Sequence, residues 1–277
     1  MYSVGSGATF PFPAIGLPDD DLPRWLALLA QNLKDADDDF AYGAMARSTD
    51  IVLSKSSKHV EEKYADYLSA LNKKQIVCIG PLIAADANRH GDIEIMKWLN
   101  GKNLDSTIYI SFGSELFLSK KQIEEIAKGL DLCDANFLWV IRFPAEVEAG
   151  LGIRLIEEEL PAGFLETVKE MGAIDKDIRP SEYRWLSMPM NVDQPMNAQL
   201  MVELGVGVVV EKDHENEVYV GEEVAKAINK VIVEKNVLYE GLRSRAQKLS
   251  ETLREKEDEE VNEVAQQLLK ICAKNKK

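Results

Sequence analysis

Residues 105–118, which read DSTIYISFGSELFL, constrain the fold of this chain more than any other segment. The apolar run at 108–110 ends abruptly at small residues around Gly113. A run of β-branched and aromatic residues bounded by turn residues predicts a buried strand. Ser119 then stands three residues before Gln122, which is the spacing of a capping box, and apolar residues follow at helical spacing. The order of strand, small-residue turn and helix predicts an α/β fold with an open parallel sheet.

The turn that follows this strand is a candidate anion site. Ligands of open α/β sheets bind at the carboxyl ends of the strands, and backbone N–H groups at a helix start attract anions. Gly113 also lacks the Cβ atom that would keep a phosphate away. An ordinary strand-to-helix turn without a ligand explains the same four residues, Ser-Phe-Gly-Ser, so the turn by itself leaves both interpretations open.

Composition narrows the classes of function. The 277 residues are 45% apolar and 29% charged, which is typical of a globular protein rather than a disordered one. A net charge of −14 argues against a nucleic-acid partner, because phosphate backbones are bound by clustered Lys and Arg. Local N–H groups can still bind a nucleotide in an acidic protein.

Cysteines and apolar runs indicate the cellular compartment. Cys78, Cys133 and Cys272 lie far apart and match no zinc-binding spacing, so each is expected to be a buried or surface thiol in a reducing compartment. No apolar run approaches the roughly 18 residues that a membrane helix needs, and no signal peptide is recognisable. A cytoplasmic protein without a membrane partner is expected.

The first third of the chain predicts a partial α/β domain. Residues 22–33 favour a helix, which an acidic run at 35–39 follows as a solvated face rather than a cation site. Residues 51–53 and 75–79 predict two strands, and the apolar spacing from Val60 to Leu71 predicts a helix between them. Residues 82–89 are typical of a linker. We therefore expect one domain at 1–85 and a second at 86–277.

The second domain continues the alternation of strands and helices. Residues 136–141 predict another strand of the same sheet, and helices are expected from 160 to 171 and from 194 to 204, with a strand at 206–210 between the latter and the next helix. Residues 172–183 are polar and contain Pro180, so no strand is predicted there. Two helices between 236 and 274 are expected to close the chain.

Six short motifs in a fixed order identify a family. Residues 111–114 read SFGS, 137–142 read FLWVIR, 160–164 read LPAGF and 189–198 read PMNVDQPMNA; FPFPAI at 10–15 and GPL at 80–82 precede them. In this order the motifs resemble the plant UDP-sugar-dependent glycosyltransferases, in particular the members that extend sugar chains on terpenoid and flavonoid glycosides.

The resemblance implies a GT-B fold, in which two Rossmann-like domains face one another across a cleft. Residues 1–85 would be a partial acceptor-side domain, and 86–277 would be the domain that binds the UDP-sugar. The family's reaction is a direct displacement at the anomeric carbon of the sugar. A His oriented by an Asp removes the proton of the acceptor hydroxyl, and helix N-termini stabilise the departing UDP. The UDP-sugar is a substrate, and neither a cofactor nor a metal is expected.

The departures from the family pattern are equally informative. The segment that bears the family's catalytic His and Asp has no counterpart in this sequence, and His59, His90 and His214 are expected to be surface residues. The family's donor-binding box, which opens with W-A-P-Q and passes through H-C-G-W-N-S, is missing, so an internal deletion is expected near 172–185. No catalytic residue is assigned, and the chain as written is expected to be inactive or weakly active.

Four residues match donor-binding positions of the family. Asp193 and Gln194 match the acidic residue and Gln that bind the hydroxyls of the donor sugar, although Asp193 could instead cap a helix. Gly113 and Ser114 match the turn that approaches the donor phosphates. The tryptophans at 139 and 185 are expected to pack in the core rather than stack on uracil.

Two functions follow from these observations. The first is a UDP-glycosyltransferase, which transfers a sugar from a UDP-sugar to a hydroxyl of a small plant metabolite or of its glycoside. The alternative is a non-catalytic, shortened relative that binds a nucleotide or a partner. Because a deletion within a parallel sheet exposes neighbouring strand edges, a homo-oligomer is also expected.

Overall fold

The structure is a computed structural model of the 277-residue chain. It describes residues 3–4, 8–9, 11–12, 45, 47–48, 51–80, 93–103, 106–112, 116–133, 135–143, 158–169, 171–175, 185–190, 193–213, 218–234 and 237–274. The predicted helix at 22–33, the acidic run at 35–39 and the linker at 82–89 lie outside these residues.

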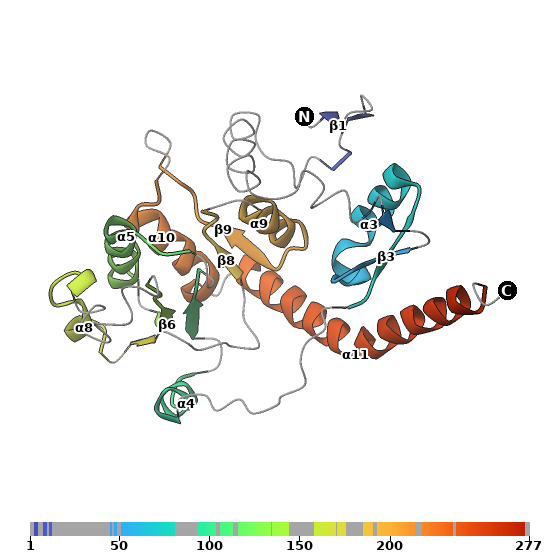
Figure 1. Ribbon diagram of the computed structural model, residues 1–277. Coiled ribbons are helices and arrows are strands. Elements are labelled where there is room, and N and C mark those ends of the chain that lie inside the picture. Colours follow the sequence, from blue (N-terminus) through green and yellow to red (C-terminus); the bar gives the residue numbers. More distant parts are fainter. Residues whose placement is uncertain are drawn as a thin grey trace. The chain divides into compact units, whose positions relative to one another are not determined.

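The described chain alternates strands and helices (Figure 1). The strands are β1 (Ser3–Val4), β2 (Ala8–Thr9), β3 (Ile51–Ser54), β4 (Gln75–Cys78), β5 (Thr107–Ile110), β6 (Asn136–Val140), β7 (Gly172–Asp175), β8 (Trp185–Ser187) and β9 (Gly207–Val209). The helices are α3 (Lys58–Asn72), α4 (Ile93–Asn100), α5 (Lys120–Asp131), α8 (Phe164–Thr167), α9 (Gln194–Glu203), α10 (Gly221–Ile228), the π-helix η2 (Asn229–Val233) and α11 (Val237–Lys274).

The chain divides into two compact units. Unit 1 consists of Met1–Ala87, Asn191–Met196 and Gln247–Lys277, and unit 2 consists of Asn88–Met190 and Asn197–Ala246. The C-terminal segment therefore groups with the N-terminal one, whereas the sequence suggested the contiguous ranges 1–85 and 86–277. Those domain limits and the internal deletion near 172–185 stay predictions.

Unit 1 contains the predicted strand–helix–strand element. β3 pairs with β4 in parallel, with Val52 opposite Ile76, and α3 connects the two strands. Ser57 caps α3 by accepting a hydrogen bond from the amide of His59, and Lys73 ends the helix in the left-handed conformation. None of the 15 residues of α3 is fully buried, so this helix lies on the surface of the described part of unit 1.

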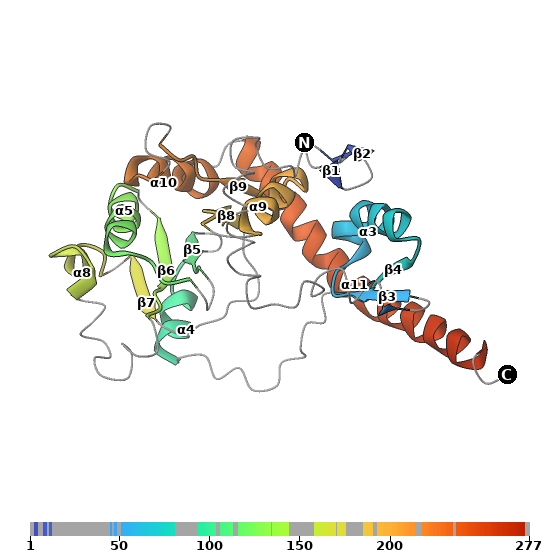
Figure 2. The ribbon, with the colours of Figure 1, turned by 45° about the horizontal axis from the view of Figure 1, so that its top comes forward.

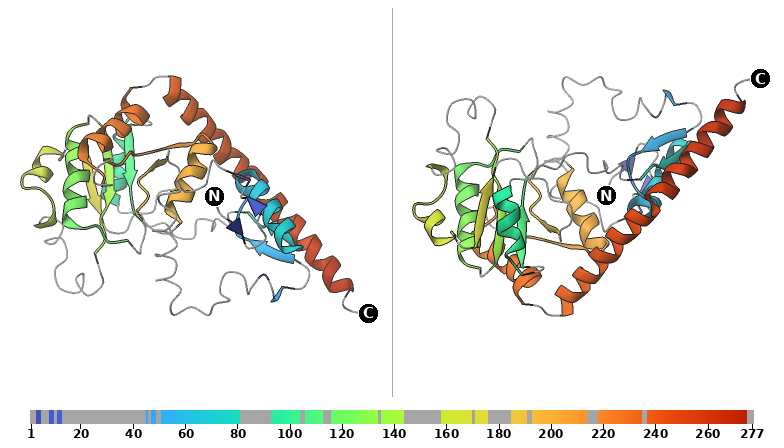
Figure 3. Two further views of the ribbon diagram at one scale, coloured as in Figure 1. Left: turned by 90° about the horizontal axis from the view of Figure 1, so that it is seen from above. Right: turned by 90° about the horizontal axis from the view of Figure 1, so that it is seen from below.

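Unit 2 is built on a parallel sheet in the order β5-β6-β7 (Figure 2). Ile108 pairs with Phe137, and Phe137 in turn pairs with Gly172. Phe137 and Trp139 of β6, and Ile141 directly after it, belong to the core cluster with the apolar side chains of α5 and α10. The views in Figure 3 show α5 lying along the sheet.

β7 corrects a prediction from the sequence. We expected no strand at 172–183, yet Gly172–Asp175 forms one in parallel with β6. The strand is short and begins with a glycine, so it lacks the β-branched run by which strands are recognised. Gly172 is required by its neighbour, because a Cβ atom there would lie 2.3 Å from Cζ of Phe137. The strand is therefore specified by pairing with β6 rather than by its own composition.

The C-terminal region also differs from expectation. The two helices predicted there form one continuous helix of 38 residues, α11. A helix was predicted over 160–171, but the observed helix α8 is shorter and comprises only the four residues Phe164–Thr167. At the end of α9, Gly205 adopts φ +69°, and the Nε of Arg245 donates a 2.7 Å hydrogen bond to its carbonyl oxygen. A glycine in this conformation is a common helix terminator.

Candidate functional site

The carboxyl ends of β5 and β6 define one edge of the parallel sheet. Because the two strands are parallel and paired, the segments that leave them, Ser111–Phe112 and 141–143, emerge at the same edge. Phe112 and Phe143 are half-buried and pack against the core of unit 2. This is the edge at which open α/β sheets bind their ligands.

α5 begins close to this edge, after the segment that leaves β5. The predicted capping box is confirmed: the Oγ of Ser119 accepts a hydrogen bond from the amide of Gln122 at 3.4 Å. In return the Oε1 of Gln122 accepts one from the amide of Ser119 at 2.8 Å. The box fixes the direction in which the chain enters α5.

The segment after β8 is connected to the same helix. Tyr219, which is 8% exposed, donates a 2.8 Å hydrogen bond from its hydroxyl group to the carbonyl oxygen of Pro189. The Nε2 of Gln122 donates to the Sδ of Met190 at 3.6 Å, a weak contact because a thioether is a poor acceptor. Burial raises the pKa of Tyr219, so the phenol remains a neutral donor. Gln122 thus contacts both Ser119, at the start of α5, and Met190, in the segment that follows β8.

The structure describes two of the four predicted site residues. Gly113 and Ser114 lie outside the described residues. Asp193 is exposed and immediately precedes α9, and Gln194 is the half-buried first residue of that helix. Asp193 therefore stands at the position of a helix cap, which was the alternative interpretation of this residue. The role of all four residues in donor binding stays a prediction.

Other candidate residues are placed more simply. Trp139 is fully buried in the core, as expected, and His59 is exposed, whereas His90 and His214 lie outside the described residues. Trp185 belongs to β8, whose backbone alone is described at that position. Among the described residues, no group of three or more His, Cys, Asp or Glu side chains could hold a metal ion. No helix in that part of the chain is long and apolar enough to cross a membrane.

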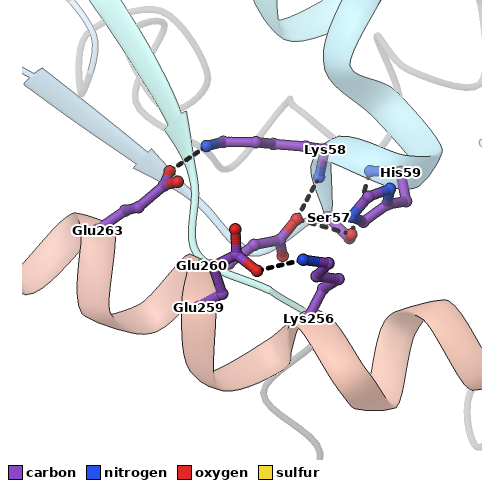
Figure 4. A network of polar contacts seen from close by, with 7 residues as sticks. All are labelled: Ser57, Lys58, His59, Lys256, Glu259, Glu260 and Glu263. Carbon is purple, nitrogen blue, oxygen red and sulfur yellow. Dashed lines mark hydrogen bonds and ion pairs between the residues drawn. The ribbon is translucent and has the colours of Figure 1, made fainter.

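Two residues with structural roles were not predicted from the sequence. Tyr219 is a single aromatic residue between two valines, and nothing in its spacing indicates a contact with Pro189. Glu260 lies in the run EKEDEE at 255–260, where no glutamate differs from its neighbours, yet it is 4% exposed and bonded to the start of α3 (Figure 4). In both cases the partner is distant in the sequence.

Sequence comparison identifies homologues of the chain. No protein-family model matches the chain. Mogroside IIIx synthase of Siraitia grosvenorii is 38% identical over 78% of this chain and 53% of its own length. The β-D-glucosyl crocetin β-1,6-glucosyltransferase of Gardenia jasminoides is 35% identical over 96% of this chain and 65% of its own length. The chain is a homologue of the plant UDP-glycosyltransferases.

Solved structures of plant UDP-glycosyltransferases share its fold. Os79 of O. sativa, solved in complex with U2F and trichothecene, superposes with a TM-score of 0.69 at 21% identity, over 92% of this chain and 61% of that one. This likeness, together with the parallel sheet of unit 2, shows a partial α/β fold of the GT-B type, as the sequence motifs implied. The chain spans between about half and two thirds of the length of these relatives.

Proposed function

We propose, on the homology of the chain, the function of a UDP-glycosyltransferase, the transfer of a sugar from a UDP-sugar to a hydroxyl group of a small plant metabolite or of its glycoside, with the 277 residues inactive or weakly active by themselves. The observation that carries the proposal is that most of this chain aligns with plant glucosyltransferases, at 38% and 35% sequence identity to the two relatives named above. The relative from Gardenia jasminoides is named for an acceptor that already bears glucose. A glycosylated acceptor is therefore the first class to test, and a cytoplasmic location is part of the same proposal.

The donor phosphates would bind after β5, at the carboxyl edge of the sheet in unit 2. We assign Gly113 and Ser114 to the phosphates and Asp193 with Gln194 to the sugar hydroxyls, on the positions that they occupy in the family's motifs. The capping box of Ser119 and Gln122 supports the assignment, because it orients the helix start to which the phosphate turn leads. The hydrogen bond from Tyr219 to Pro189 holds the segment that leads from β8 towards the other pair.

The missing family motifs determine what the chain can do by itself. The sequence lacks the H-C-G-W-N-S segment between β7 and β8, where the family has it. One donor to the developing charge contributes roughly 10²- to 10³-fold to a rate. We therefore expect the 277-residue chain to bind UDP without measurable sugar transfer. The same absence supports the alternative function, a non-catalytic relative that binds a nucleotide or a partner.

Calorimetric titration with UDP tests the donor site. The chain is first purified and shown by size exclusion to be folded and unaggregated. We expect micromolar binding that Ser114→Ala and Asp193→Ala weaken, whereas Asp131→Ala, a change of an exposed acid at the far end of α5, leaves it unchanged. A folded chain that does not bind UDP would show that the assignment of these residues is wrong.

A transfer assay separates the two functions. The chain is incubated with UDP-glucose and a phenolic glycoside, and products are measured by mass spectrometry. Turnover that Asp193→Ala abolishes would contradict the expected inactivity and establish the enzyme. UDP binding without turnover supports the non-catalytic relative for the chain as written. Light scattering during size exclusion measures the proposed homo-oligomer, for which the outer strands β5 and β7 of the described sheet offer edges.

A further inference from the structure

The start of α3 holds a buried polar cluster. Among the described residues, the buried polar or charged side chains are Ser56, Ser57 and Glu260, at 8%, 4% and 4% exposure. The two serines precede α3, and Glu260 belongs to α11, about 200 positions later in the chain. A buried glutamate is uncommon, because a carboxylate that leaves water must find hydrogen-bond donors in the protein.

Glu260 finds these donors at the helix start. Its Oε1 accepts a 3.0 Å hydrogen bond from the Oγ of Ser57 and a 2.9 Å bond from the backbone amide of Lys58 (Figure 4). The Oγ of Ser57 in turn accepts from the amide of His59 at 3.2 Å. The first amides of a helix lack partners within the helix, and the positive end of the helix dipole favours a negative charge. Glu260 thus caps the amide of Lys58 from a distant segment of the chain, and Ser57 caps the next amide, that of His59.

The backbone at Gly80 lies close to the carboxylate of Glu260. Gly80, which follows β4, has φ +79°, and a Cβ atom at this position would lie 3.3 Å from the Oε2 of Glu260. The amide of Gly80 donates to the carbonyl oxygen of Ser56 at 2.8 Å, which ties the end of β4 to the turn after β3. Two parallel strand ends beside a helix start form the place at which α/β units bind anions. In unit 1 a side chain of the same protein occupies that place.

Ion pairs flank the buried contact on the same face of α11. Lys58 pairs with Glu263, and Lys256 pairs with Glu259. Together with Glu260 these α11 residues follow the spacing of one helical face, towards α3. The contact with Glu263 raises the pKa of Lys58, but exposed ion pairs contribute little to stability. Of the two pairs, only Lys58–Glu263 joins α3 to α11, because Lys256 and Glu259 both belong to α11.

We propose that the turn between β3 and α3 is a carboxylate-binding site whose ligand is Glu260, and that this contact fastens the C-terminal half of α11 to the strand–helix–strand element of unit 1. The inference does not depend on the proposed enzymatic function. It assigns to α11 the role of a strap that a buried carboxylate helps to hold.

Comparison of two neighbouring glutamates tests this proposal. Since hydrogen bonds to a charged group are strong, Glu260→Ala should lower the folding equilibrium constant on the order of 10- to 100-fold. The matched control Glu259→Ala removes an exposed carboxylate from the adjacent position and should leave it nearly unchanged. Equal stability of the two variants, measured by urea unfolding, would overturn the proposal.

Chemical rescue distinguishes a carboxylate site from a general loss of packing. Sodium formate should raise the melting temperature of Glu260→Ala more than sodium chloride does at equal ionic strength, and it should not do so for the wild-type chain or for Glu259→Ala. If Glu260→Ala does not fold, Glu260→Gln, which keeps an acceptor but loses the charge, is compared with Glu259→Gln by urea unfolding. Absence of a formate-specific effect in a folded Glu260→Ala would contradict the proposed site.

A double-mutant cycle provides a further readout. Ser57→Ala and Glu260→Ala should be strongly coupled in their effects on the folding equilibrium, because they share one hydrogen bond. Ser57→Ala and Glu259→Ala should be additive. Hydrogen exchange of the Lys58 amide, which donates to Glu260, should accelerate in Glu260→Ala more than the exchange of amides in the middle of α3. Additivity of the first pair would refute the direct contact.

Discussion

Replacing Gly129 by alanine probes a close contact between two helices of unit 2. Gly129 is buried near the end of α5, where this helix packs against α10. A Cβ atom at this position would lie 2.7 Å from both Cβ and Cγ1 of Val224 and 2.9 Å from the carbonyl oxygen of Gly221. These separations are shorter than carbon–carbon and carbon–oxygen contacts allow, and two of the three atoms belong to the backbone or lie next to it. The helices must therefore move apart to admit a methyl group.

Two opposing terms give the magnitude. Alanine in a helix interior is favoured over glycine by about 0.8–1.0 kcal/mol, which stabilises the variant. Insertion of a methyl group into a packed core costs about 1–3 kcal/mol. Since the clash with Gly221 involves a carbonyl oxygen held in place by its helix, the upper part of that range applies. We expect Gly129→Ala to lower the free energy of unfolding by about 1–2 kcal/mol after the propensity gain is subtracted.

Gly241→Ala provides the matched control. Gly241 lies inside α11, and a Cβ atom there would meet only the guanidinium end of Arg245, at 3.3 Å from Nη1. A shift of a few tenths of an ångström by these terminal nitrogens admits the methyl group, and the Nε of Arg245 can keep its hydrogen bond to Gly205. The control variant should therefore be more stable than the wild-type chain by up to about 1 kcal/mol, the full helix-propensity gain.

Urea unfolding followed by circular dichroism measures both variants, with the change in midpoint taken at constant slope. Opposite signs for the two alanine substitutions are the expected result. A Gly129→Ala variant as stable as Gly241→Ala would refute the close approach of α5 and α10, because only the clash distinguishes the two positions.

Two further predictions concern ionisable groups. Burial raises the pKa of Tyr219 in the folded chain above the unfolded value of about 10, so the contribution of the neutral phenol to stability is complete below about pH 10 and is lost as the pH rises above it. The urea midpoint should therefore fall between pH 9 and pH 11 by more in the wild-type chain than in Tyr219→Phe. Equal falls in the two chains would contradict the burial of Tyr219. Iodoacetamide at neutral pH should label the exposed Cys272 first, because Cys133 is buried and burial raises the pKa of the Cys78 thiol. Peptide mass spectrometry identifies the labelled sites, and Cys272→Ser should remove the fast phase of labelling. Early labelling of Cys78 would contradict the burial of this residue in β4.

The strand–helix pairs that carry their own local signals were predicted from the sequence. An apolar run predicted β5, and the capping-box spacing of Ser119 and Gln122 predicted the start of α5. Apolar spacing predicted β3, α3 and β4. Each of these elements is specified by residues within a few positions of one another. The order of the family motifs likewise sufficed to predict the homology that the comparisons confirm.

Elements that depend on distant partners were not predicted. β7 was missed because Gly172 fits its strand only beside the ring of Phe137, and Asn229–Val233 forms a π-helical turn that continues α10 without any local sequence signal. The single helix α11 was divided in two because its long charged middle shows no continuous apolar stripe.

The sequence by itself therefore determined the α/β class, the family and the positions of the strand–helix units, since periodicity, capping and motif order are properties of neighbouring residues. Tertiary structure alone decided which of many equivalent glutamates is buried at the start of α3, which tyrosine holds the segment after β8, and which glycine allows α5 and α10 to meet. The physical reason is the same in each case. A charge, a hydroxyl group or a missing Cβ atom acquires its effect from the atoms packed against it, and these come from parts of the chain that only folding brings together.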